Sequence, residues 1–466
     1  MSQRRSVILG LLMLLPLPPA GAESSADARR HEEAVRQKLQ PTEVAILKKE
    51  PRLMFDYGLW VNHLFTDFTN DDNNASREDS TDWTDALDTR AWLRAILRPP
   101  FGSPGGEHSL YVRLKDKSTW RRPQNENGAY DHDGPHVDYL YASLDLRPAF
   151  VQIGRRYYSV GQGIAYSNVN DGAELMLSFP TASLMGFVSR TLPHEDNIDL
   201  SIPGGKKSGR TFYALEGKYI GVPNHGLYGY AVFQHDDSQE KPEDQTQDYD
   251  YQSQYFGAGS EGKLLANVRY AAELILETGK SLTSVTSQER RVEAWATDLS
   301  VTYDAQLPMQ PTIYGEYAFG SGDPDRASVT DTLSGNASGA DNNFLYFGYL
   351  RTGYALSPRL SNLRMLKAGM ALKPLDRIRR WNLRELTTTV DVYRYSKDEP
   401  EGAIFDAQAS EADDDVGTEV DLTLSWPLLS DCTLDIEYGH FIPGAAYPPA
   451  TSNHTQYFAV SVTTTF

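Results

Sequence analysis

The chain has 466 residues, a formal net charge of −19 at pH 7 and a single cysteine. So acidic a chain is not expected to bind nucleic acid through a basic surface, and one cysteine excludes an internal disulfide framework. Beyond its first residues no stretch approaches the roughly 18 apolar residues of a membrane helix, and the mean hydropathy is −0.48. A chain of this kind can span a membrane only as a closed β-barrel, which satisfies every backbone amide internally.

The chain begins with the pattern of a secretory signal peptide. Two arginines within the first five residues precede an apolar run over residues 7–17, and small residues follow up to Ala22. We predict a signal peptide over residues 1–22, whose removal takes away two positive charges and leaves a net charge of about −21. Residues 23–50 mix apolar and charged residues without strand periodicity, which predicts a periplasmic N-terminal extension. The barrel is predicted over residues 51–466.

Strand-like alternation then recurs along the chain. In the last stretch, Phe458, Val460 and Val462 share one face of an extended strand, Tyr457 lies on the other, and the chain ends on Phe466. One apolar and one polar face per strand is the pattern of a barrel that faces lipid outside and water inside. We count about eighteen such segments, near residues 55–62, 87–98, 110–115, 139–146, 150–160, 172–180, 183–190, 209–221, 225–236, 252–265, 268–281, 290–305, 310–322, 364–375, 381–396, 416–428, 431–444 and 455–466.

The connections alternate in length, which separates a membrane barrel from a soluble sandwich. Tight turns are expected at residues 147–148, 180–181, 222–224, 307–309 and 428–430, and long polar loops at residues 69–84, 120–137, 158–171, 191–208, 236–252, 322–343, 397–415 and 443–454. Many tryptophans and tyrosines lie near strand ends, as interfacial girdles do. The sequence therefore predicts an all-β fold: one antiparallel transmembrane β-barrel of about 18 strands, with long extracellular loops and short periplasmic turns, in the outer membrane of a Gram-negative bacterium.

Two segments stand out from this pattern. The first runs from Gln152 to Tyr158 with the pair Gly154-Arg155 and continues to Asn170-Asp171-Gly172; the second runs from Tyr314 to Asp323 and is followed by an aromatic stretch over residues 344–349. At these residues the chain resembles the alginate-export family of outer-membrane barrels. The resemblance implies a pore for a polyanionic polysaccharide, lined with basic residues, and loops that reach into that pore.

Alternation places several basic side chains on the predicted inner faces. Carboxylates crossing a narrow pore need cations along the way, and the planar arginine side chain suits them. The candidates are Arg90, Arg94, Arg113, Lys115, Arg156, Arg210, Lys218 and Arg269, and Arg155 of the Gly-Arg pair is included with them. Asn170, Asp171 and Asp323 are candidates in constricting loops. Acidic residues share these faces, at Asp88, Asp145, Glu174, Glu216, Glu273 and Glu277, so the charges can instead pair across strands as struts.

The functional alternatives are a channel for an exported acidic polysaccharide, a porin for small neutral or anionic solutes, and a barrel-borne hydrolase. The third would need a nucleophile, a base and an orienting group, and no such set occurs at a recognisable spacing around His63, Ser167 or His235. We therefore predict a channel and not an enzyme, with no cofactor and no metal site. The expected partners are the lipid bilayer and an anionic polysaccharide or small solutes, with periplasmic export components as further candidates.

Overall fold

The computed structural model describes residues 53–69, 82–98, 106–122, 128–192, 209–237, 251–282, 289–330, 336 and 338–466. The predicted signal peptide and the predicted N-terminal extension lie outside these residues. None of the helices in the described ranges is long and apolar enough to cross a membrane.

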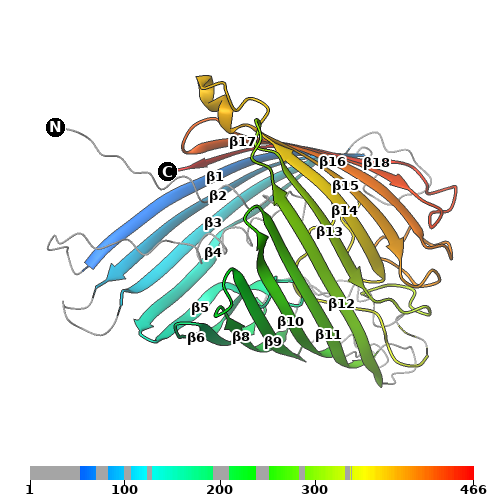
Figure 1. The fold of residues 1–466 in the computed structure, drawn as a ribbon, viewed down its shortest axis with the longest axis horizontal. Coiled ribbons are helices and arrows are strands. Elements are labelled where there is room, and N and C mark those ends of the chain that lie inside the picture. Colours follow the sequence, from blue (N-terminus) through cyan, green and yellow to red (C-terminus); the bar gives the residue numbers. More distant parts are fainter. Residues whose placement is uncertain are drawn as a thin grey trace.

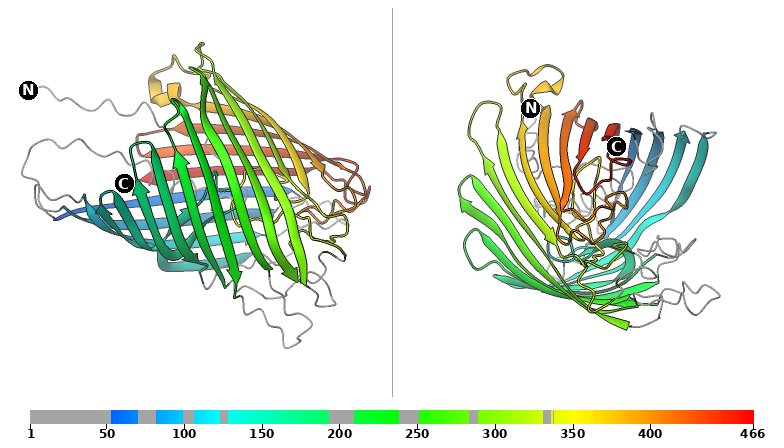
Figure 2. Two further views of the ribbon diagram at one scale, coloured as in Figure 1. Left: turned by 60° about the horizontal axis from the view of Figure 1, so that its bottom comes forward. Right: turned by 90° about the vertical axis from the view of Figure 1, so that its right-hand side faces the viewer.

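The fold is an 18-stranded antiparallel sheet that closes on itself, so the predicted fold class and strand number are confirmed (Figures 1 and 2). The strands are β1 (Leu53–Thr69), β2 (Asp82–Leu97), β3 (His108–Arg122), β4 (Ala129–Leu146), β5 (Ala149–Ser159), β6 (Ser167–Ser178), β7 (Ala182–Arg190), β8 (Arg210–Tyr219), β9 (His225–Asp236), β10 (Tyr251–Leu265), β11 (Val268–Leu282), β12 (Glu289–Asp304), β13 (Thr312–Gly320), β14 (Leu363–Leu372), β15 (Thr387–Lys397), β16 (Asp415–Pro427), β17 (Cys432–Pro443) and β18 (Thr455–Thr465).

The first and last strands close the barrel. β18 pairs with β1 in an antiparallel register that runs from Trp60 opposite Thr465 to Thr69 opposite Gln456. The backbone N–H of the terminal Phe466 donates to the carbonyl of Leu59 at 2.8 Å. Because every strand has two neighbours, no edge is left unpaired, as a sheet in lipid requires.

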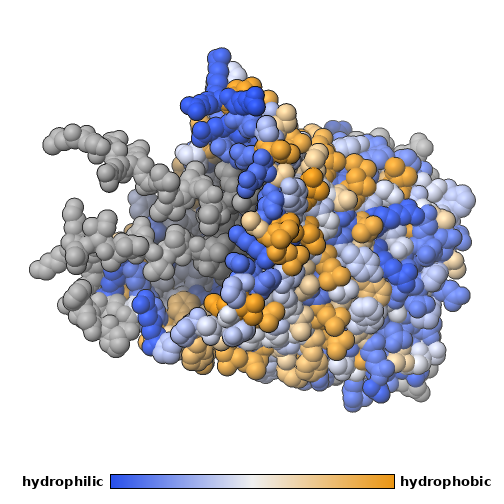
Figure 3. Space-filling model, viewed as in Figure 1, coloured by the Kyte–Doolittle hydropathy of each residue, from blue (hydrophilic) through white to orange (hydrophobic). Residues whose placement is uncertain are grey.

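Each strand sorts its side chains between the two faces of the wall. Outward residues such as Leu93, Leu215 and Leu276 are between 43% and 53% exposed. On the visible wall a hydrophobic band lies between more hydrophilic ends (Figure 3). Inward residues such as Asn62 and Glu273 are buried although they are polar. This is the reverse of a soluble barrel, and it gives the wall a lipid-facing exterior and a polar lumen.

One periplasmic connection differs from the prediction. The strand expected over residues 381–396 begins only at Thr387, because Trp381 and Asn382 adopt left-handed backbone angles (φ 54° and 56°) within a short 3-10 helix, η2 (Arg380–Glu385). Two side-chain contacts hold this conformation: the amide of Asn382 donates to the carbonyl of Pro427 at 2.7 Å, and the indole of Trp426 donates to the carbonyl of Trp381 at 3.1 Å. Alternation in the sequence cannot reveal such long-range contacts.

Candidate functional site

The C-terminal part of β5 and the N-terminal part of β6 leave the barrel wall. β4 pairs with β5 only as far as Leu140 opposite Arg155, and β6 pairs with β7 only as far as Asp171 opposite Arg190. β5 and β6 nevertheless stay paired with each other up to Ser159 opposite Ser167. In residues 156–170, which we call the inner hairpin, the strand backbones therefore pair with each other and not with the neighbouring strands of the wall.

The inner hairpin crosses between two parts of the wall. On one side, Tyr157 and Val169 pack in a buried cluster with Tyr111 of β3 and Tyr139 of β4. On the other side, the ring of Tyr166 packs 4.4 Å from that of Phe212 on β8, measured between centroids. The hydroxyl groups of Tyr166 and of Ser189 on β7 lie 2.6 Å apart. The hairpin thus occupies the barrel interior, and most of its side chains are buried there.

A second segment enters the lumen between β13 and β14. Residues 321–362, the inserted loop, contain the aromatic stretch singled out in the sequence, and Phe344 and Tyr346 of that stretch are buried. Phe347 forms a parallel bridge with Tyr166 of the inner hairpin, and its N–H donates to the carbonyl of Ala165 at 3.0 Å. The hairpin and the loop therefore pack as one body inside the barrel.

Inward glutamates of the wall hold these two segments through backbone amides. Glu277 of β11 accepts a hydrogen bond from the N–H of Leu345, at 2.9 Å. The other contacts are those of Glu216 with the N–H of Gly161 (2.7 Å), Glu273 with that of Gln162 (2.7 Å), and Glu419 with those of Tyr354 (2.6 Å), Ala355 (2.7 Å) and Leu356 (2.9 Å). These four carboxylates inside the barrel thus hold the two segments in position. Sequence reasoning placed Glu216, Glu273 and Glu277 on inner faces but did not single out Glu419, although the alternation of β16 would have included it.

Eight of the nine predicted basic residues lie on the inner face: Arg90, Arg94, Arg113, Lys115, Arg156, Arg210, Lys218 and Arg269. Six of these form ion pairs: Arg90 with Asp88 (2.8 Å), Arg113 with Asp138 (2.7 Å), Arg156 with Glu174 (2.8 Å), Arg210 with Asp236 (2.8 Å), Arg269 with Asp304 (3.0 Å), and Lys218 with Glu261. The alternative in which charges brace the lumen wall thus applies to most of them.

Arg155 lies on the outward face, so its inclusion among the inward residues was wrong. It is opposite the outward Leu140, on the face of β5 that carries the exposed Ile153. Its guanidinium pairs with Asp171 at 2.9 Å, and Asp171 lies on the same outward face of β6. The Gly-Arg pair is followed by Arg156, and because alternate residues of a strand face opposite ways, only Arg156 of the two arginines points inward.

The two other loop candidates are buried. The amide of Asn170 donates to the hydroxyl of Tyr166 at 2.7 Å within the inner hairpin. Asp323, in the inserted loop, accepts hydrogen bonds from the amide of Asn336 and from the N–H of Asn342, both at 2.9 Å. Burial, with the neighbouring carboxyl of Asp325, raises the pKa of Asp323 to about 6. Within the described ranges no group of three or more His, Cys, Asp or Glu side chains is arranged to hold a metal ion.

Basic and aromatic side chains share the inner face of β2 and β3. Arg90 lies opposite Lys115, and Arg94 lies opposite Tyr111. Between them Trp92 stacks on Tyr111, with ring centroids 6.0 Å apart. We call Arg90, Trp92, Arg94, Tyr111, Arg113 and Lys115 the inner basic patch. Guanidinium and aromatic groups side by side suit a ligand that carries both carboxylates and flat apolar faces.

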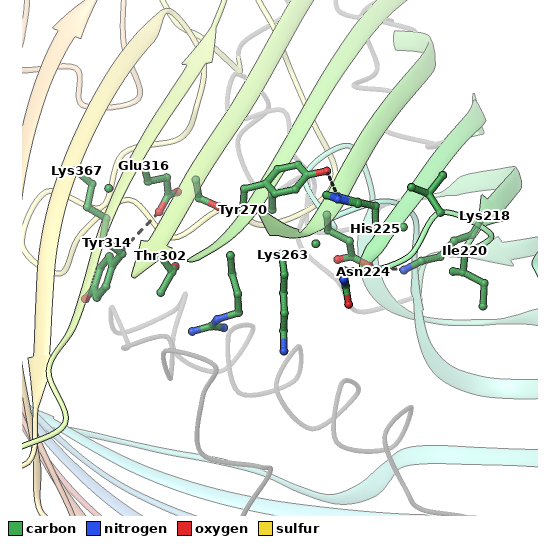
Figure 4. Close-up of a pocket in the computed structure, with 18 residues that line it drawn as sticks. Lys218, Ile220, Asn224, His225, Lys263, Tyr270, Thr302, Tyr314, Glu316 and Lys367 are labelled. Atoms are coloured by element: carbon green, nitrogen blue, oxygen red, sulfur yellow. Dashed lines mark hydrogen bonds and ion pairs between the residues drawn. The ribbon is translucent and has the colours of Figure 1, made fainter. Parts of the chain in front are cut away.

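A cavity of about 720 Å³ opens at the periplasmic end of the opposite wall (Figure 4). Its charged lining comes from several strands, and the aromatic rings of Tyr270 and Tyr314 lie beside it. Among the residues that line it, four basic side chains face two carboxylates: Lys218, Lys263, Arg269 and Lys367 against Glu261 and Glu316. Sequence reasoning included Lys218 and Arg269 but missed Lys263 and Lys367, although both follow the alternation of their strands.

Comparison with known proteins gives one family and one fold. A family model described as "Alginate export" matches residues 126–461. Among curated proteins, none matches the chain in sequence.

Among solved structures, Pseudomonas aeruginosa OccK5 (OpdH) is 9% identical with a TM-score of 0.55, over 88% of this chain and 98% of that one. Pseudomonas aeruginosa OccK8 (OprE) is 10% identical with a TM-score of 0.55, over the same shares. Acinetobacter baumannii OccAB4 is 10% identical with a TM-score of 0.51, again over 88% and 98%. At such identities the likeness concerns the barrel fold.

Proposed function

Because the chain belongs to the alginate-export family and forms a multi-pass outer-membrane barrel, we propose that this outer-membrane channel passes an anionic, uronate-rich polysaccharide across the membrane. The observation that carries the proposal is the gathering of four basic side chains around the periplasmic-end cavity, in a chain whose net charge is −19. Lys218, Arg269 and Lys367 have carboxylate partners there, and Lys263 has none among the described residues. Cationic side chains along the path lower the cost of bringing carboxylates into a wall of low dielectric constant.

The inner basic patch supports the same substrate class. Trp92 and Arg94 are partly exposed, so an indole face and a guanidinium are both offered to the lumen. An indole can stack on the apolar face of a sugar ring, while guanidinium binds carboxylate through two parallel hydrogen bonds. The pattern fits an acidic sugar polymer better than a neutral one.

The inner hairpin and the inserted loop supply the constriction in this proposal. They lie inside the barrel, where the wall glutamates fix them through backbone amides. A polymer must then pass beside this body or displace it. Hydrogen bonds to charged groups contribute about 2 kcal/mol each, so displacing the inner hairpin and the inserted loop would cost free energy.

The test is the ion selectivity of the purified barrel in planar bilayers, with oligouronates and neutral oligosaccharides of equal length as blockers. We expect a preference for anions and a block by the oligouronate. The double variant Arg94→Glu with Lys263→Glu should weaken that block at least tenfold, since each substitution reverses one charge beside the path. Cation selectivity of the native barrel together with unchanged block in the variant would refute the proposal.

The runner-up is a porin for small neutral or anionic solutes. It shares the same fold and lumen, and it makes a different prediction for blockers. If the solutes are neutral, neutral oligosaccharides would block as strongly as oligouronates, and the charge-reversed variant would bind both equally well.

A further inference from the structure

The periplasmic connection between β14 and β15 is strongly basic. Residues 373–386, which we call the basic turn, hold five Lys or Arg residues and two carboxylates, in a chain whose net charge is −19. Both carboxylates are engaged at its base: Glu385 pairs with Lys373 at 2.6 Å, and Asp376 accepts the N–H of Met309 at 2.9 Å. In the described part of the chain no carboxylate pairs with Arg377, Arg379 or Arg380. Three guanidinium groups of the turn therefore have no carboxylate partner among the described residues.

The basic turn lies against the outer, lipid-facing side of the barrel rim. The carbonyl of Trp381 accepts the indole N–H of Trp426, and Trp426 shares the outward face of β16 with the exposed Leu422. Figure 1 shows the turn rising beyond the strand ends above β14 and β15. Contact with Trp426 places it over the wall instead of over the mouth of the lumen.

The exposed face of the basic turn combines charge with apolar side chains. Trp381 is 66% exposed and Ile378 43%, and the guanidinium of Arg380 lies 4.4 Å from the centroid of the Trp381 ring. The turns on either side continue the apolar part, since Leu307 is 62% exposed and Leu429 64%. The left-handed backbone conformation of Trp381 costs conformational energy. The hydrogen bond from Trp426 on the next turn stabilises it.

We propose that the basic turn binds the headgroups of anionic phospholipids in the periplasmic leaflet of the outer membrane. Short turns mark the periplasmic end of such barrels, so this surface meets a phospholipid leaflet at the rim of the wall. Tryptophan is favoured at the membrane–water interface, and arginines beside it attract anionic headgroups. The apolar neighbours on the adjoining turns continue the same interfacial surface. This binding surface is separate from the channel function.

The test measures lipid binding by the purified mature protein in detergent, titrated with phosphatidylglycerol or with phosphatidylethanolamine and read by native mass spectrometry. We expect a preference for phosphatidylglycerol of at least tenfold, because each arginine near an anionic headgroup adds to the attraction. The triple variant Arg377→Glu, Arg379→Glu, Arg380→Glu should lose that preference. A matched control reverses three arginines at the extracellular end, Arg291→Glu, Arg364→Glu and Arg394→Glu, and should keep it.

Equal binding of the two lipids by the native protein, or equal losses in both triple variants, would overturn the proposal. So would loss of oligouronate binding in the basic-turn variant with lipid preference intact, which would assign the turn to the polymer. If the triple variant does not fold, a second measurement tests the proposal. Brominated phosphatidylglycerol should quench the fluorescence of the native barrel more than that of Trp381→Phe, and equal quenching would place Trp381 outside the lipid interface.

Discussion

Gly154 and Gly172 face each other across β5 and β6 at the point where the inner hairpin leaves the barrel wall. A Cβ atom at Gly154 would lie 2.1 Å from the carbonyl oxygen of Leu140, and one at Gly172 would lie 2.2 Å from that of Val188. Gly154 also has a φ of +127°, which L-residues rarely adopt. The departure of the hairpin into the lumen thus depends on two residues without side chains.

Replacing Gly154 by alanine should displace the inner hairpin while leaving the barrel closed. The added methyl group meets backbone on the neighbouring strand, and the backbone strain is about 2 kcal/mol. We expect an altered single-channel conductance and faster proteolysis within residues 156–170. Gly217→Ala is the matched control, because a Cβ there meets nothing within 4 Å. Equal conductance of the native protein and Gly154→Ala would show that the hairpin does not depend on this glycine.

Arg155→Gln and Arg94→Gln remove the same charge from opposite faces of the wall. Arg155 is paired with Asp171 on the outward face, whereas Arg94 faces the lumen opposite Tyr111. We expect the reversal potential in a salt gradient to shift toward cation preference only for Arg94→Gln, since a charge outside the wall is screened from the ion path. A similar shift in both variants would contradict the outward placement of Arg155.

The barrel could be predicted from sequence because lipid outside and water inside impose a period of two on every strand. The turn at Arg147-Pro148 and the closing strand up to Phe466 are examples, since each depends on a local signal. The faces of Arg94 and Lys218 followed from the same alternation. Arg155 was placed wrongly because it was grouped with its motif and not with the parity of its strand.

What alternation could not predict were contacts between segments far apart in the chain. The pairing of Tyr166 with Phe347 joins two segments that are separated by eight strands, β6 to β13. The hydrogen bonds from the inserted loop to Glu419 also join distant parts of the chain, since Tyr354 and Glu419 are 65 residues apart. The helical turn at Trp381 depends on Trp426 and Pro427 of another hairpin. Such contacts leave no periodic signal, so the constriction could be anticipated only as loops that enter the pore.

Glu419→Gln should loosen the inserted loop. The carboxylate of Glu419 accepts the N–H groups of Tyr354, Ala355 and Leu356, and an amide loses the charge that strengthens all three hydrogen bonds. Hydrogen bonds to charged groups contribute about 2 kcal/mol each, so we expect amide exchange in residues 350–360 to accelerate at least tenfold and channel noise to rise. Glu293→Gln, at an exposed ion pair with Arg291, is the control, and it should change neither quantity.

The inserted loop should also respond to pH through Asp323. Its pKa is raised to about 6, above the ordinary value of about 4, so the folded loop binds the proton more tightly than the unfolded loop does. The loop is then most stable below about pH 4, and it loses stability as the pH rises through 6. Amide exchange in residues 321–362, corrected for the intrinsic effect of pH, should therefore accelerate between pH 4 and 7. In Asp323→Asn this acceleration should vanish, because the amide does not titrate, whereas Glu401→Gln in another loop should retain it. An unchanged pH profile in Asp323→Asn would assign the response to a different group.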